Sequence, residues 1–509
     1  MSDIWMILLP FIILVGTLLL CLILEAFDLG RRAFGIISIL GCLSSLYILI
    51  LGINSDVVHV FGNPANLIDL TSEPGLFVID NFYRFFAMIF LIVLLFVTTS
   101  SIDYVSSERT IGIYYVLLIF STIGMMLVAA ANDLLVLFVA WELGSVPTYA
   151  LAAYQKTRAE TSESALKFFL IGAMSSAFIL FGISLVYGIV GTTSIDSVKD
   201  VITSIAEPNN YYPLHLLALM FLLVGFGYKI AAVPFHAWAV DVYQGTPTTI
   251  TAFLAAGSKA LGFVAVFRMI VAGLTEVDVI WGILFAILAV LTMTLGNVVA
   301  LVQENIKRML AYSSIAHAGY ILIAFAAVAN NPISREFSVA AAEMHILTHA
   351  IMKIVAFTVV IVVAFSIHSE KIEDYVGLRK KHPWLTFGLT IALLSLLGIP
   401  PLAGFVSKLL LFFAAIYANL IWLAVIGIIN SAISIFYYLR VIKLMIVDTP
   451  IEERDDVSVI PVERITPFPI PLSYQLTIGI SVLLIIIIGL LPSPFLDFAL
   501  SAAQNLLEI

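Results

Sequence analysis

The sequence predicts an all-α integral membrane protein with about 14 transmembrane helices, and three observations support this class. Of its 509 residues, 62% are hydrophobic and 11% are charged, and the mean hydropathy is +1.11. Soluble domains carry about 25% charged residues, so this chain lacks the polar surface that water requires. Apolar runs of about 20 residues, long enough to span a bilayer, recur along the whole chain. Lysine and arginine also gather in alternate loops.

The apolar runs define the expected spans in order. They are 4–25, 33–52, 77–101, 113–131, 133–154, 164–190, 213–243, 248–272, 278–302, 308–329, 336–368, 384–418, 420–446 and 473–498. The first run lacks a basic flank and is long enough to span, so we expect a helix there and not a cleaved signal. Residues 191–212 hold a weak amphipathic segment, and residues 447–471 form the one long polar loop.

The distribution of basic residues tests this count. Fifteen of the 24 lysines and arginines fall in odd-numbered loops and four in even-numbered loops. The positive-inside rule then places the odd loops in the cytoplasm and both termini on the non-cytoplasmic side. A missed helix would scramble the bias, so the count of fourteen is favoured. The net charge of −9 is spread over loops and indicates no nucleic-acid partner.

The five remaining basic residues are lysines inside expected spans: Lys167, Lys229, Lys259, Lys353 and Lys408. A lysine at the membrane centre costs roughly 2.5–3.5 kcal/mol on the insertion scale, so we expect all five to face a polar interior. A desolvated amine can take up and release a proton near neutral pH, whereas arginine stays charged. The alternatives are a lysine that reaches the membrane surface or a structural ion pair, above all for Lys167 and Lys353 near their helix starts.

Prolines interrupt two spans that occupy matching positions in two similar units. Lys229 precedes Pro234 in the seventh span, and Lys408 follows the run LLGIPPLAGF in the twelfth. Proline removes a backbone donor and clashes with the preceding turn, so both helices should break inside the membrane. Five helices separate the two breaks, and this odd offset predicts inverted repeats, the arrangement of transport proteins with a site near the midplane.

We therefore expect two inverted five-helix repeats, formed by the fourth to eighth and the ninth to thirteenth spans. The predicted domains are residues 1–112, the first repeat 113–272, the second repeat 273–446, and 447–509 with the polar loop and the last helix.

Further titratable groups extend the row of lysines. Glu142 is a carboxylate that could pair with a lysine, and His317 can relay protons. His345 and His349 are spaced i, i+4 with Lys353 at i+8, so the three share one helix face. His236 follows the first break; a cap or water contact is the alternative for it, and a structural contact between helices for the other histidines. The two cysteines, Cys21 and Cys42, lie in apolar runs and hold no metal or cluster motif.

These residues carry a resemblance to the antiporter-like membrane subunits of respiratory complex I. The run PFHAWAVDVYQGTPTTITAFLAAGSKALGF, 234–263, is similar to the signature of their seventh and eighth helices, and NIKRMLAYSSIAHAGY, 305–320, resembles the tenth. The VYQGTP segment and Lys408 resemble the N-type chain, since the M-type chain has a glutamate at that position. By motif, Glu142, Lys167, Lys229, Lys259, His317 and Lys408 match family positions.

The resemblance implies a proton channel in a membrane arm. The proposed proton path is Glu142, Lys167, Lys229, Lys259, His317, Lys353, Lys408, His349 and His345, of which His345 rests on its helical spacing alone. It implies no cofactor on this chain, and places quinone, or a methanophenazine-like carrier, and iron–sulfur clusters on partner subunits. The expected partners are M-, K-, J- and A-type chains, and the expected location is a prokaryotic cell membrane or, alternatively, a thylakoid. Three alternatives are a cation/proton antiporter subunit, a hydrogenase-linked membrane arm and an inert scaffold. The scaffold would leave five buried lysines unused.

Overall fold

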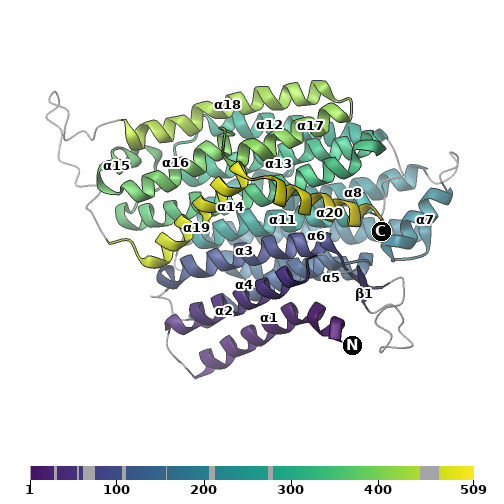
Figure 1. The fold of residues 1–509 in the computed structure, drawn as a ribbon, viewed down its shortest axis with the longest axis horizontal. Coiled ribbons are helices and arrows are strands. Elements are labelled where there is room, and N and C mark those ends of the chain that lie inside the picture. The colour runs from purple at the N-terminus through teal and green to yellow at the C-terminus, as the bar shows by residue number, and fades with distance from the viewer. Residues whose placement is uncertain are drawn as a thin grey trace.

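The computed structural model describes residues 2–27, 31–53, 57–60, 75–105, 110–155, 158–205, 212–272, 279–447 and 469–508. Most of the predicted polar loop, residues 448–468, lies outside these ranges. So do Arg109, Lys156, Arg454 and Arg464, four of the loop residues that we used to predict orientation. Figure 1 shows the described residues as a bundle of long helices, with α1 and α18 at opposite edges and α13 and α14 between them.

The helix count agrees with the prediction of fourteen spans. Thirteen helices of the described ranges are long and apolar enough to cross a membrane, and the shorter pair α16 and α17 makes one further broken crossing. The helices are α1 Ser2–Ala26, α2 Arg31–Leu51, α3 Asn81–Tyr104, α4 Ile111–Ala130, α5 Leu134–Ala152, α6 Ala159–Val190, α8 Tyr212–Ile230, α9 Ala237–Gly245, α12 Val279–Ala300, α13 Ile306–Asn330, α14 Arg335–Ile367, α16 Pro383–Leu397, α17 Ala403–Tyr417, α18 Ile421–Ile446 and α19 Leu472–Leu490.

The eighth span changes its helical pitch twice. It runs through α10 Thr248–Phe253, the π-helical η1 Leu254–Ser258, α11 Lys259–Val266 and the π-helical η2 Phe267–Ala272. Short π-helical turns inside α-helices occur frequently at functional sites. The first of them directly precedes Lys259, one of the predicted site residues.

Both predicted breaks are present. The helix α8 ends at Ile230 and α9 begins at Ala237, with Pro234 in the connection; α16 ends at Leu397 and α17 begins at Ala403, with Pro400 and Pro401 between them. At the second break Gly398 has a φ of 94°, which side chains other than hydrogen rarely allow, and Ser395 Oγ accepts a hydrogen bond from the Gly404 amide at 3.0 Å. The breaks thus expose backbone groups next to Lys229 and Lys408.

Two predicted boundaries are wrong. Residues 77–79 form β2 (Phe77–Ile79), paired antiparallel with β1 (Val58–Val60), and α3 starts only after Asp80, whose side chain caps it at the Tyr83 amide. The last span ends at Leu490 and not at 498, because Pro492 and Pro494 interrupt the helix there. A further helix, α20 (Ser493–Glu508), follows and packs against α3 and α14. The predicted amphipathic segment is the helix α7 (Ile195–Ile205).

Three smaller helical turns complete the fold: η4 (Pro332–Ser334), η5 (Ile372–Tyr375) and α15 (Leu378–Lys381). The most deeply buried spans are the eighth, α13 and α14, while α1, α2 and α18 show large apolar side chains on their outer faces. Polar side chains on the central spans are therefore shielded by other helices, and these spans carry most of the predicted site.

Candidate functional site

Lys229 lies at the end of α8, where the helix breaks. Its side chain is buried, its Nζ donates a hydrogen bond to Ser145 Oγ of α5 at 2.9 Å, and the rings of Trp141, Tyr149 and Phe168 surround it at 5.6–5.7 Å. A hydroxyl and aromatic faces stabilise an ammonium without neutralising it. The amine therefore has a neutral hydroxyl partner where a structural lysine would have a carboxylate.

The surroundings of Glu142 and Lys167 differ from those that the sequence predicts. Glu142 accepts a hydrogen bond from Ser176 Oγ of α6, and it forms no ion pair among the residues that the structure describes. Lys167, which we expected to face a buried interior, has 43% of its side chain exposed and pairs with Glu163 at 2.8 Å and Asp241 at 2.9 Å. Lys167 sits in the first turns of a 32-residue helix, which explains its access to the surface. Glu142 and Lys167 do not meet.

A polar network that the sequence analysis missed surrounds Asp241 of α9. Arg308 of α13 contacts both Asp241, at 3.3 Å, and the side chain of Gln244, at 2.8 Å. Its neighbour Lys307 donates to the Gln244 and Thr246 carbonyls at 2.7 and 3.0 Å and pairs with Glu370 at 3.2 Å. The VYQGTP segment, to which we assigned no chemistry, thus joins the first repeat to the start of α13.

Lys259 continues the row from the first repeat into the second. One turn after it, Gly262 lies directly against Lys229: a Cβ added at Gly262 would be 3.3 Å from the Lys229 Cβ and 2.7 Å from the Ile230 side chain. This glycine permits the close approach of α11 to α8. Lys259 Nζ donates to the Ser314 carbonyl of α13 at 2.8 Å, and its side chain is buried.

Lys353 of α14 binds the neighbouring turn of α13. Its Nζ donates to the Leu310 carbonyl and to Ser313 Oγ, both at 2.8 Å, and Ser313 in turn is 2.5 Å from the Tyr438 hydroxyl of α18. Lys259 and Lys353 therefore bind adjacent residues of the same helix, Ser314 and Ser313. No carboxylate contacts either lysine in the described part of the chain.

The three histidines meet between α13 and α14. His317 Nδ1 and His345 Nε2 are 2.9 Å apart with nearly parallel rings, and the His349 ring centroid is 5.1 Å from that of His317. His345 Nδ1 reaches Ser407 Oγ of α17 at 3.0 Å, and Thr348 Oγ1 donates to the same hydroxyl at 2.9 Å. The predicted i, i+4, i+8 face of α14 is thus present, and it connects Lys353 to the second break.

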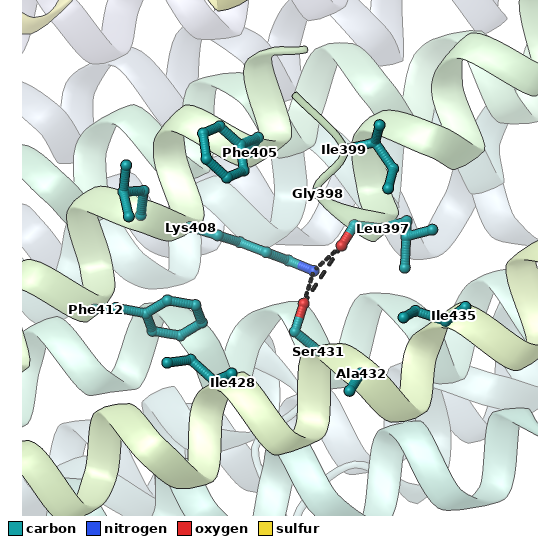
Figure 2. A pocket seen from close by; sticks show the side chains of 11 residues that line it. Leu397, Gly398, Ile399, Phe405, Lys408, Phe412, Ile428, Ser431, Ala432 and Ile435 are labelled. Carbon is teal, nitrogen blue, oxygen red and sulfur yellow. Dashed lines mark hydrogen bonds between the residues drawn. The ribbon is translucent and has the colours of Figure 1, made fainter. Parts of the chain in front are cut away.

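Lys408 follows Ser407 and ends the row. Its Nζ donates to the Leu397 carbonyl at 3.0 Å and to Ser431 Oγ at 3.1 Å, and lies 4.9 Å from the Tyr320 ring centroid. Figure 2 shows this amine directed at the break between α16 and α17, inside a cavity of about 280 Å³ with mostly apolar walls. The Leu397 carbonyl at the end of α16 thus takes the place of a charged partner for Lys408.

His236 lies partly buried at the first break, and its Nδ1 has no hydrogen-bond partner among the described residues, so it does not join the row of lysines and histidines. The residues that sequence reasoning missed are the hydroxyl partners Ser145, Ser313, Ser407, Ser431, Thr348, Tyr320 and Tyr438. Serines and threonines in helices commonly bond to their own backbone, as Ser38 does to Phe34, so the residue type alone did not mark them.

A model of the family described as NADH:quinone oxidoreductase/Mrp antiporter, transmembrane, matches residues 131–434, more than half of the chain. The chain belongs to this family. It is 39% identical over 98% of its length to F(420)H(2) dehydrogenase subunit N of Methanosarcina mazei, 98% of which is covered. It is 38% identical over 96% of its length to NAD(P)H-quinone oxidoreductase subunit 2 of Picosynechococcus sp., 90% of which is covered.

A solved structure also shares the architecture of this chain. A chain of respiratory complex I from Thermus thermophilus superposes with a TM-score of 0.76 at 32% identity, covering 96% of this chain and 98% of that one. The chain is thus a multi-pass integral membrane protein with about 14 spans and two inverted five-helix repeats, as the sequence predicted.

Proposed function

We propose that this chain is the N-type membrane-arm subunit of a complex I-type oxidoreductase and translocates protons through its interior while partner subunits reduce a quinone. The observation that supports this proposal is the series of buried groups Lys229, Lys259, Lys353, the three histidines and Lys408. In this series each ammonium has hydroxyl or carbonyl partners and no carboxylate within the described residues. Such amines can lose a proton without leaving an unpaired anion behind.

The proposed relay starts at Lys229, which takes up a proton from the cytoplasmic side under the influence of Glu142 and of the Lys167–Asp241 pair. The proton passes to Lys259 and then, through the hydroxyl of Ser313 and the water that a polar interior admits, to Lys353. His349, His317 and His345 carry it to Lys408, from which it leaves on the other side. A proton on one group of the row repels the positive charge on the next group. Small motions of these groups can therefore drive the following proton transfer.

The electron carriers belong to other subunits in this proposal. We assign quinone, or a methanophenazine-like carrier, and iron–sulfur clusters to partners, and we propose neighbours of the M, K, J and A types. The named relatives of this chain act in complexes called F(420)H(2) dehydrogenase and NAD(P)H-quinone oxidoreductase. One type of N chain therefore serves different electron donors, so the donor is a property of the partners.

The proposed setting is a prokaryotic cell membrane, with both termini on the non-cytoplasmic side. The division into residues 1–112, 113–272, 273–446 and 447–509 is also part of the proposal. The two helix breaks support this division, since one lies in residues 113–272 and the other at an equivalent position in residues 273–446.

The family model also covers antiporter subunits, so a cation/proton exchanger is the second candidate. The experiment that separates the two is purification of the tagged chain from its native membrane in mild detergent. Subunits with iron–sulfur clusters and quinone reductase activity in the eluate would support the proposal. Small antiporter partners without a redox protein, together with sodium-dependent proton exchange, would contradict it.

A further inference from the structure

Glu343 of α14 is a buried carboxylate that the proposed proton path does not use. Its side chain is fully buried, and both of its carboxylate oxygens lack a hydrogen-bond partner among the described residues. An ionised carboxylate without partners costs several kcal/mol or more in a low-dielectric interior, so such groups are neutral or paired. Within the described residues Glu343 is not paired. In this conformation we therefore take it to carry a proton.

The position of Glu343 separates it from the histidine cluster. At about 100° per residue, Glu343 points roughly 200° away from His345 on α14. Among the elements that α14 packs against are α3, α10 and η1. Glu343 also lies near the end of α14 opposite to the Lys307–Glu370 pair, since α14 begins at Arg335 and Glu370 follows its last residue.

A buried ion pair joins η2 to the start of α3. Arg268 of η2 donates from Nη2 to both Asp80 carboxylate oxygens, at 2.9 and 2.8 Å, and from Nε to the Ala129 carbonyl at 2.8 Å. α14, which carries Glu343, packs against α3, the helix that Asp80 caps. Asp80 neutralises the guanidinium, and Glu343 forms no ion pair among the described residues. Arg268 Nη1, however, is buried without a partner in the described part of the chain.

We propose that Glu343 is a further proton-binding residue of this chain, which releases and rebinds its proton during turnover while Arg268 acts as the counter-ion of the ionised form. The step breaks one carboxyl O–H bond and passes the proton to water. The carboxylate that remains accepts a hydrogen bond from the free Nη1 of Arg268, and no electron moves. A guanidinium shared between Asp80 and Glu343 links the charge on α14 to the ends of α3 and α4. This inference rests on the proposed proton translocation.

The test is the number of protons translocated per electron in vesicles that contain the whole complex, with Glu343→Gln, Glu343→Asp and Lys229→Ala compared in one assay. Glutamine has the shape of the protonated acid but cannot release the proton. We expect Glu343→Gln to lose as much proton translocation as Lys229→Ala, and Glu343→Asp to restore most of it. A parental ratio in Glu343→Gln together with a loss in Lys229→Ala would overturn this inference alone. Parental ratios in both would overturn the proposed function as well.

A spectroscopic readout covers the case in which Glu343→Gln does not assemble. Redox-induced infrared difference spectra of the parental complex should show the carbonyl band of a protonated carboxyl, sensitive to D₂O. In Glu343→Asp this band should move, because the acid differs. An unchanged band in Glu343→Asp, or no such band in the parent, would contradict proton exchange at this residue.

Discussion

At the scale of single residues, the buried lysines are distinguished by their partners. Lys229 binds a serine hydroxyl, Lys259 binds a carbonyl, and Lys353 and Lys408 each bind both kinds of group. A structural lysine in a membrane interior would instead be paired with a carboxylate, as Arg268 is with Asp80. The lysines, which have neutral partners, can thus change charge, whereas Arg268, which is paired with Asp80, stabilises the fold.

The first prediction concerns Lys353, which is fully buried. Lys353→Met keeps the length of the side chain but removes the amine, so we expect proton transfer through this chain to slow by about 100-fold or more, as for a lost general acid–base group. Lys353→Arg should behave similarly because a guanidinium does not release its proton. Proton uptake in reconstituted vesicles measures the effect.

The matched control is Lys371→Met. Lys371 has 65% of its side chain exposed and lies 3.7 Å from an exposed carboxylate of Glu373, so its removal should leave proton transfer unchanged. Equal rates in the parent and in Lys353→Met would remove Lys353 from the path.

The second prediction concerns Ser407, which satisfies both His345 and Thr348. Ser407→Ala leaves His345 Nδ1 without its partner, while Thr348 Oγ1 keeps the His345 carbonyl at 3.2 Å, and it should lower the free energy of unfolding by about 1–3 kcal/mol. Ser366→Ala is the control in a nearby helix: among the described residues its hydroxyl bonds only to the Val363 carbonyl, so the change should stay within about 0.5 kcal/mol. Thermal unfolding in detergent compares the two, and equal midpoints would contradict the role of Ser407.

At the scale of elements, the two helix breaks bring backbone carbonyls to the lysines. The α16–α17 break closes tightly, because a Cβ at Gly404 would overlap the Ser395 carbonyl. Lys408 depends on this closure, since its Nζ binds the last carbonyl of α16 from the second turn of α17. Figure 2 shows the Lys408 side chain extended toward Leu397 and Ser431.

Gly404→Ala should therefore open the break and lower the free energy of unfolding by about 1–3 kcal/mol, the usual cost of forcing atoms into a packed site. Gly188→Ala, in an exposed part of α6 with no atom within 4 Å of the added Cβ, should be neutral or stabilising by up to about 1 kcal/mol. The unfolding midpoints of both variants should be compared with the parent. Identical behaviour of the two alanines would show that the break is not constrained at Gly404.

Much of the element pattern could be predicted because hydropathy and proline act locally. The fourteen spans and both breaks follow from runs of apolar residues and from Pro234, Pro400 and Pro401. The site was predicted less completely. Lys167 and Lys229 are each a lysine in an apolar run, yet one lies at the surface and the other is buried. Only the packing of α6 against its neighbours separates them, and sequence periodicity does not describe packing between distant helices.

At the scale of the whole molecule, buried polar contacts connect elements that are distant in sequence. The Arg268–Asp80 pair joins the eighth span to the start of α3 and, through Ala129, to the end of α4. The bond from Lys259 to the Ser314 carbonyl joins the eighth span of the first repeat to α13 of the second, and Lys353 joins α14 to the same turn of α13. Changes of charge in one repeat can thus be transmitted to the other without large motions.

Arg268→Met should destabilise the molecule strongly, because it leaves the Asp80 charge buried and unpaired. Breaking a buried pair in this way costs about 3–5 kcal/mol. Arg32→Met is the control: Arg32 has 79% of its side chain exposed and lies 3.9 Å from Asp103, so the change should cost less than about 1 kcal/mol. Yield and unfolding midpoint in detergent report the difference, and a stable Arg268→Met protein would contradict the structural role of the pair.

The central claim is that protons cross the membrane through the lysine and histidine row of this chain. The most direct measurement is the number of protons translocated per electron by the assembled complex with Lys229→Ala, in sealed vesicles and beside the parent. We predict that electron transfer continues or slows while the ratio falls, because the first amine of the row is missing. A complex that assembles with Lys229→Ala and keeps the parental ratio would show that the protons take another path.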